Sequence, residues 1–159
     1  MKGAFARNVF ARVARVRGRT WAKLAAAASL LVLWSIAGGG HRRSWPRADI
    51  LDAIRFVESS GRERPPDGDG GKAIGPYQIW QIYWQDAIAA EPSIGGSYED
   101  CRDRDYAERV VAAYMRRWVP EAWNAGDAEV IARVHNGGPR GFENPKTDRY
   151  WDKVRSRLP

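Results

Sequence analysis

Residues 48–60 have an amphipathic helical pattern, which stops at a glycine. Its apolar residues recur at helical spacing: Ile50, Leu51, Ile54 and Val57. One face of this predicted helix must therefore pack against other elements. Gly61 stands where a C-cap residue is expected. Residues 62–76 are rich in Gly and Pro, which predicts a loop or a short β-hairpin.

Four more helices are predicted after this loop. The first covers residues 77–90, with Ile79, Ile82, Tyr83 and Asp86 on one face. The other three each begin at a capping signal: an Asp105–Glu108 capping box opens a helix that Pro120 stops, Asp127 precedes residues 128–135, and Thr147 precedes residues 148–158. The pattern predicts an α+β domain that is mostly α.

Glu58 lies at the edge of the apolar face of the first helix, close to the helix end. Partial burial and the negative end of the helix dipole both disfavour a carboxylate, so both raise the pKa of this group. A raised pKa suits a general acid, which must give a proton to a leaving oxygen. The alternative is a glutamate whose stem packs on the core while its carboxylate reaches water.

The net charge of +7 comes from the N-terminal leader. Residues 1–37 hold seven basic residues and no acidic one, so the rest of the chain is formally neutral and predicts no binding of nucleic acid. The basic part precedes a charge-free stretch, residues 24–37, which is short for a membrane-spanning helix. We therefore expect a signal peptide or a membrane anchor at residues 1–37, a linker at 38–47 and the globular domain at 48–159. The domain would be exported to the periplasm or the extracellular space, or tethered to the cytoplasmic membrane.

Cysteine and histidine are scarce in this chain. Cys101 is the only cysteine, so no intramolecular disulfide can form, and an inert thiol is expected there. His41 and His135 are the only histidines. The composition therefore predicts neither a structural metal site nor a cofactor.

Several sequence blocks, in one consistent order, resemble a known family. They are VESSG around Glu58, GPYQI at residues 75–79, YWQDA at 83–87, ERVVAAYMRRW at 108–118, ARVHNGG from Ala132, and YW at 150–151. Together they are similar to the lysozyme-like superfamily, and most closely to the invertebrate-type lysozymes, or destabilase family. The resemblance covers nearly all of residues 50–158 and implies a lysozyme-like catalytic domain.

The resemblance implies a peptidoglycan-cleaving glycosidase that acts on the β-1,4 bond between N-acetylmuramic acid and N-acetylglucosamine. Glu58 takes the place of the general acid. The second carboxylate would be a loop aspartate, for which Asp69 matches the family pattern better than Asp67. The alternative role for either aspartate is a local turn bond.

The resemblance also implies supporting roles around a sugar cleft. Tyr77 and Gln78 would line it after the loop, and His135 and Asn136 would contact substrate from the other side; Tyr77 could equally be core, and the turn after His135 could be purely structural. Animal members are rich in disulfides, so the loop around Asp69 must be held differently here. The serine that some members are credited with using for isopeptidase cleavage is replaced by Gly71 or Lys72, so that activity is not predicted.

Two other functions compete with hydrolysis. A lytic transglycosylase needs only Glu58, because the C6 hydroxyl of the substrate closes onto C1. A non-catalytic module would bind peptidoglycan without cleaving it. In all three cases peptidoglycan glycan strands are the expected partner, and a monomer is expected.

Overall fold

The computed structural model describes residues 43–159, and the predicted signal peptide or anchor lies outside them. The elements within this part, in chain order, are α2 (Arg47–Ser59), β1 (Ala73–Ile74), β2 (Ile79–Trp80), α3 (Gln81–Ala90), η1 (Pro92–Ile94), η2 (Tyr98–Arg102), α4 (Arg104–Trp118), α5 (Pro120–Ala125), α6 (Ala128–Gly137), η3 (Gly141–Glu143), η4 (Pro145–Thr147) and α7 (Asp148–Arg155). The mostly helical α+β class is thus confirmed.

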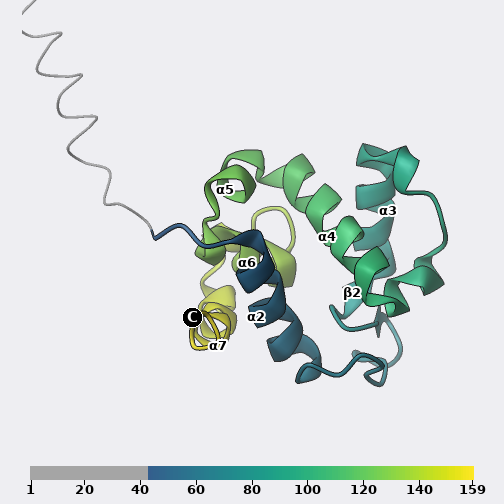
Figure 1. Cartoon of the computed structure of the whole chain (residues 1–159), viewed down its shortest axis with the longest axis horizontal. Coiled ribbons are helices and arrows are strands. Elements are labelled where there is room, and N and C mark those ends of the chain that lie inside the picture. Colours follow the sequence, from purple (N-terminus) through teal and green to yellow (C-terminus); the bar gives the residue numbers. More distant parts are fainter. Residues whose placement is uncertain (1–42) are drawn as a thin grey trace, which may run out of the picture. The chain divides into compact units, whose positions relative to one another are not determined.

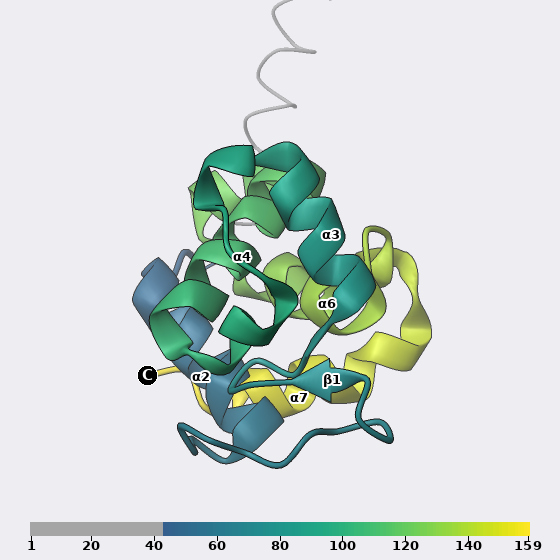
Figure 2. The same ribbon diagram turned by 90° about the vertical axis from the view of Figure 1, so that its right-hand side faces the viewer.

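The helices pack around one core (Figure 1). α3 packs on α4, α6 packs on α7, and α7 also packs on α2. The hairpin of β1 and β2 and the loop before it lie at one end of this bundle, below α3 in the view of Figure 2. The largest side chains that are fully buried include Tyr77, Ile50, Ile54, Ile74, Ile79 and Met115. The apolar face predicted for the first helix is therefore the face that enters the core.

Two predicted helix starts are confirmed, and one is two residues out. Asp127 caps α6 by accepting from the backbone N–H of Val130, and α7 begins directly after Thr147. The cap of α4 is Asp103, which accepts from the N–H of Tyr106. The predicted capping box of Asp105 and Glu108 was therefore wrong. α4 starts two residues earlier, and Asp103 is the residue that caps the N–H groups of its first turn.

The end of α2 also differs slightly from the prediction. Ser60, and not Gly61, is the C-cap residue, with a left-handed backbone at φ 54°. Gly61 follows with φ 75°. Two successive residues with positive φ turn the chain sharply away from the helix axis.

The helix predicted over residues 77–90 begins four residues later, at Gln81. Ile79 pairs with Ile74 across the two strands, and Gln78 before it has a left-handed φ of 46°. A residue in that region interrupts a right-handed helix. Of the face predicted for this helix, Ile79 and Tyr83 are buried, but Ile82 is 63% exposed.

The compact unit begins at Arg43, inside the stretch predicted as a linker. The hydroxyl of Ser44 donates to the carbonyl of Ala125, and the N–H of Trp45 donates to the carbonyl of Gly126. These bonds fix the chain before α2 against the end of α5.

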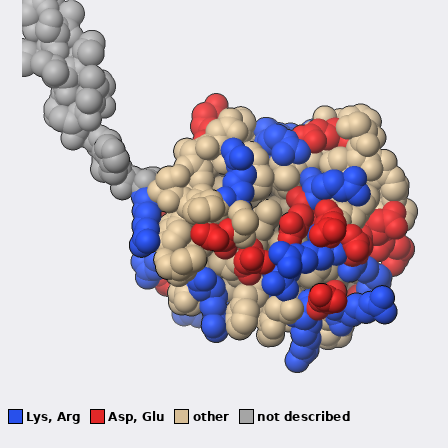
Figure 3. Space-filling view, in the orientation of Figure 1, with Lys and Arg blue, Asp and Glu red and all other residues tan. Residues whose placement is uncertain are grey.

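Acidic and basic side chains are interspersed on the face shown in Figure 3. Several of the charged groups are paired, as in Arg116 with Glu91 and Arg104 with Glu108. Within residues 43–159 no helix is long and apolar enough to cross a membrane. The same residues contain no group of three or more His, Cys, Asp or Glu side chains that could hold a metal ion.

Candidate active site

Glu58 stands in the last turn of α2 with its carboxyl group turned inward, and 18% of its side chain is exposed. The hydroxyl of Tyr150, from α7, donates to Oε1 of Glu58 across 2.6 Å. Because α7 packs on α2, the tyrosine reaches the carboxyl group from the core side. The acid is thus partly buried and held by one strong hydrogen bond.

The environment raises the pKa of Glu58 to about 7. Burial is the main cause, and the negative charge of Asp69 adds to it. The hydrogen bond from Tyr150 and the positive charge of Lys153 act in the opposite direction. Burial outweighs both, so the group is still substantially protonated at neutral pH.

His135 lies next to Glu58 but is uncharged. Burial lowers the pKa of its ring to about 4. A neutral ring with its proton on Nε2 donates to the carbonyl of Tyr77 (3.1 Å), and Nδ1 then accepts from the hydroxyl of Tyr83 (3.4 Å). Nε2 is also 3.7 Å from Oε1 of Glu58. This last contact is not an ion pair, because the imidazole carries no charge near neutral pH.

Asp69 belongs to the exposed loop before β1 and has a left-handed backbone at φ 49°. Its Oδ2 accepts from the indole N–H of Trp80, at the end of β2, across 3.1 Å. Its charge is among the causes that raise the pKa of Glu58. The two candidate carboxylates therefore act on each other electrostatically, while one is partly buried and the other is in water.

Asp67 has a different role. Both of its carboxylate oxygens accept from the guanidinium of Arg102, and this interaction lowers the pKa of Asp67. The carboxylate is thus committed to an ion pair that ties the loop to η2. Of the two aspartates left open by the sequence, Asp69 is the one whose charge acts on Glu58.

The loop around Asp69 is held by polar bonds where animal relatives were expected to use disulfides. The hydroxyl of Tyr98 lies 2.7 Å from the carbonyl oxygen of Ile79 and 2.9 Å from that of Lys72. The side-chain amide of Gln78 donates to the carbonyls of Pro66 and Gly75. Tyr98 thus joins both sides of the hairpin to η2, and Gln78 joins the turn between the strands to the loop.

Cys101 takes no part in that scaffold as a cross-link. It is a free, fully buried thiol in η2. Burial raises its pKa to about 12. A thiol that stays protonated at neutral pH is a poor nucleophile, in agreement with the inert role expected for it.

A cavity of about 270 Å³ is lined by a neighbour of each candidate acid, although neither Glu58 nor Asp69 lines it. Its wall includes Trp80, which binds Asp69, and His135, which lies next to Glu58. The remaining lining residues are Gln78, Ile79, Ile82, Tyr83, Asp86, Tyr114, Asn136, Gly138 and Pro139. A larger hollow of about 830 Å³ is lined by charged residues such as Arg64 and Asp105 and includes neither Trp80 nor His135.

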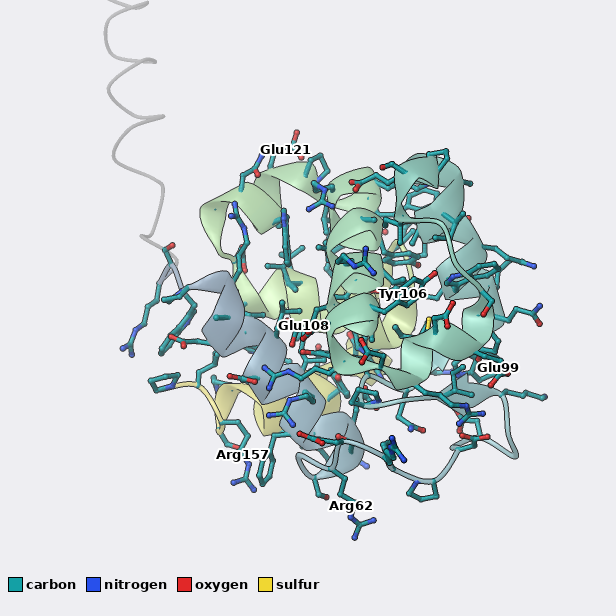
Figure 4. All side chains as sticks on the ribbon, turned by 45° about the vertical axis from the view of Figure 1, so that its right-hand side comes forward. Arg62, Glu99, Tyr106, Glu108, Glu121 and Arg157 are labelled. Atoms are coloured by element: carbon teal, nitrogen blue, oxygen red, sulfur yellow. The ribbon has the colours of Figure 1, made fainter. Side chains whose placement is uncertain are left out.

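The predicted cleft residues fall into two groups. Gln78, His135 and Asn136 line the cavity, and Asn136 is exposed at the end of α6. Tyr77 does not, since its side chain is fully buried and its hydroxyl donates to Glu108. Figure 4 shows Glu108 on the side of α4 that faces α2. The core role is the one that fits Tyr77, because it has no surface to offer a sugar.

The sequence gives no indication of the bond between Tyr150 and Glu58. The residue is 92 positions from Glu58, so no local spacing links the two. The tyrosine of the YW block was visible as part of the family resemblance. The block points to the tyrosine as a family residue, but it does not say which group its hydroxyl binds.

Comparisons with known proteins agree with this architecture. A family model described as Destabilase matches residues 49–157. Invertebrate-type lysozyme 6 of Caenorhabditis elegans is 32% identical over 120 residues, which are 70% of this chain and 87% of that protein. A lysozyme of Magallana gigas is 41% identical over 83 residues, 52% of this chain. The chain spans little more than half of that relative's length, 58%.

Solved structures give the same picture. The Meretrix lusoria lysozyme, crystallised in complex with Aeromonas hydrophila PliI, superimposes with a TM-score of 0.58 at 32% identity, covering 68% of this chain and 87% of that one. The Tapes japonica lysozyme gives a TM-score of 0.56 at 30% identity, covering 67% and 85%.

Proposed function

The chain belongs to the destabilase family of invertebrate-type lysozymes, and from this premise we propose that it hydrolyses the β-1,4 bond between N-acetylmuramic acid and N-acetylglucosamine in peptidoglycan. Glu58 is the general acid and Asp69 the second carboxylate. The glycan strand lies along the cavity bordered by Trp80, His135 and Asn136.

The reaction needs two carboxyl groups in different protonation states. Protonated Glu58 gives its proton to the glycosidic oxygen as the bond to C1 breaks. The carboxylate of Asp69 then supports the positive charge at C1 or bonds to that carbon, and water completes the hydrolysis with Glu58 as the base. Lysozyme is itself the type case of this two-carboxylate scheme, so the chemical steps are those already known for the enzyme class.

The observation that carries the proposal is the asymmetry between these two acids. Burial raises the pKa of Glu58 to about 7, and the charge of Asp69 contributes. Asp69 lies in an exposed loop and accepts an N–H bond from Trp80. Two nearby carboxyls with opposite environments are what an acid and a charged partner require.

The test is hydrolysis of purified sacculi by the full-length protein, followed by analysis of the released muropeptides. Hydrolysis predicts products with reducing ends. Products with 1,6-anhydromuramic ends would instead identify a lytic transglycosylase. Binding to sacculi without any release, in both the wild type and Glu58→Gln, would identify a non-catalytic module. The decisive variant is Glu58→Gln, for which turnover should fall by about 10²-fold or more.

Export is part of the same proposal, because peptidoglycan lies outside the cytoplasmic membrane. Residues 1–37 would direct the chain across that membrane, either as a cleaved signal or as an anchor through residues 24–37. Cell fractionation with N-terminal sequencing of the mature protein distinguishes the two. A full-length protein in the cytoplasm would contradict both.

A further inference from the structure

Both side chains that approach the carboxyl group of Glu58 from the core do so at the same oxygen. Tyr150 donates to Oε1 across 2.6 Å, and Nε2 of His135 is 3.7 Å from the same atom. Both of these polar contacts, made from α7 and from α6, fall on Oε1. The core thus distinguishes one oxygen of Glu58 from the other.

This asymmetry decides where the proton resides. A neutral carboxyl group has one hydroxyl oxygen and one carbonyl oxygen, and the carbonyl oxygen is the better acceptor. An oxygen that accepts from Tyr150 is therefore the carbonyl one, and the proton sits on Oε2. We propose that Tyr150 is a positioning residue that holds Oε1 as an acceptor and so keeps the transferable proton of Glu58 on Oε2, the oxygen that the core leaves free.

His135 supports the same arrangement from α6. Its Nε2–H is directed to the carbonyl of Tyr77, and Tyr83 occupies Nδ1. The ring therefore has no lone pair left to accept a proton from Glu58. The imidazole therefore does not take the proton from Glu58, and the proton stays on the carboxyl group, at Oε2.

The groups that face Glu58 from other elements make the effect of Tyr150 measurable. They are Tyr150 and Lys153 on α7, His135 on α6, Tyr83 on α3, and Asp69 in the loop. Tyr150 stabilises the carboxylate form, because a donor to an ionised oxygen binds more strongly than to a neutral one. If the donor were Glu58 and the acceptor Tyr150, the effect would have the opposite sign.

The experiment is a carbon-13 NMR titration of the Glu58 carboxyl in the full-length protein, with the signal assigned by its loss in Glu58→Gln. Tyr150→Phe should raise the pKa of Glu58 by roughly one pH unit. The alkaline limb of kcat should move upward with it, and kcat should fall while KM changes little. Tyr106→Phe is the matched control, because it removes a buried hydroxyl that donates to the carbonyl of Gly95; it should leave the Glu58 titration unchanged.

A second measurement keeps the ring and the hydroxyl in place. Replacement of tyrosine by 3-fluorotyrosine makes Tyr150 a stronger donor, so the pKa of Glu58 should fall. An unchanged or lowered pKa in a folded Tyr150→Phe, or an unchanged or raised pKa with 3-fluorotyrosine, overturns the inference.

The inference rests on the proposed function for its catalytic meaning, but the titration does not depend on turnover. If Glu58→Gln remained active, the proposed function would fail while the NMR result stood. If the titration failed in an enzyme that Glu58→Gln inactivates, only the role of Tyr150 would be lost.

Discussion

The indole N–H of Trp80 donates to Oδ2 of Asp69 across 3.1 Å, and this bond joins the end of β2 to the loop that carries the second carboxylate. Asp69 holds a left-handed backbone at φ 49°, a conformation that costs a non-glycine residue roughly 1–2 kcal/mol. The bond restrains an exposed side chain that the strained loop would otherwise leave free to rotate. Because Trp80 also lines the cavity, the same ring can touch substrate and orient the carboxylate.

The first prediction separates the two loop aspartates. Asp69→Asn should abolish most turnover, since an amide can neither support a positive C1 nor bond to it. Asp67→Asn should leave turnover close to that of the wild type and lower the melting temperature slightly, because it weakens the ion pair to Arg102. Sacculus hydrolysis and thermal unfolding of both variants check this. The reverse order of activities would move the catalytic role to Asp67.

The second prediction concerns the pH dependence of turnover. Glu58 must be protonated to act as the acid, and its pKa is raised to about 7. The rate should therefore fall as pH rises through about 7. Lys153→Met removes a positive charge that lowers this pKa, so its alkaline limb should lie at higher pH. The measurement is kcat against pH at constant ionic strength. Lys146→Met serves as the control, because Lys146 is not among the groups that change the pKa of Glu58.

Most of the helices could be predicted from the sequence because their signals are local. The apolar spacing before Glu58 and the cap at Asp127 each depend on neighbours within a few residues. The start of α3 was missed because Gln78 has a left-handed backbone, and its side-chain amide donates to the carbonyl of Pro66, twelve residues earlier. No periodicity records bonds of that kind.

The same distinction applies to the site. Glu58 could be singled out because burial and helix position follow from its own segment. Tyr150 could not be joined to it, since the contact depends on how α7 packs on α2. Tyr77 was proposed for the cleft from its place after the loop, whereas the turn between the strands directs it into the core.

The third prediction concerns the turn that opens the GPYQ block. Gly75 has φ 72°, and a Cβ there would overlap the carbonyl oxygen of Cys101. Gly75→Ala therefore adds a backbone clash to the strain of a positive φ, and should lower the free energy of unfolding by more than about 2 kcal/mol.

A matched control for that substitution exists in the same loop region. Gly70 has a similar φ of 67°, but a Cβ there meets nothing within 4 Å. Gly70→Ala should therefore show the backbone strain alone, about 1 kcal/mol. Urea unfolding of both variants measures the difference. Equal losses would mean that η2 moves freely to accommodate the added methyl group.

The last prediction concerns how the free energy of unfolding depends on pH. Glu58 and His135, which lie next to each other, should change it in opposite directions. The pKa of Glu58 is raised from 4.5 to about 7, so ionising it costs the folded state stability as pH rises from 4.5 to 7. The pKa of His135 is lowered from 6.5 to about 4, so protonating it costs stability as pH falls from 6.5 to 4. Each effect approaches roughly 3 kcal/mol at full extent, and their signs are opposite.

When one of the two groups is replaced, the change of unfolding free energy with pH should be the one that the remaining group causes. Compared with the wild type, Glu58→Gln should gain stability at pH 7 and lose the gain by pH 4.5. His135→Gln should instead become relatively more stable as pH falls below 6.5. Urea unfolding at several pH values between 4 and 7.5 gives these differences, and the double variant should show neither slope. Parallel curves for the wild type and Glu58→Gln would mean that this carboxyl ionises with an ordinary pKa, and the case for it as a proton donor at neutral pH would then be lost.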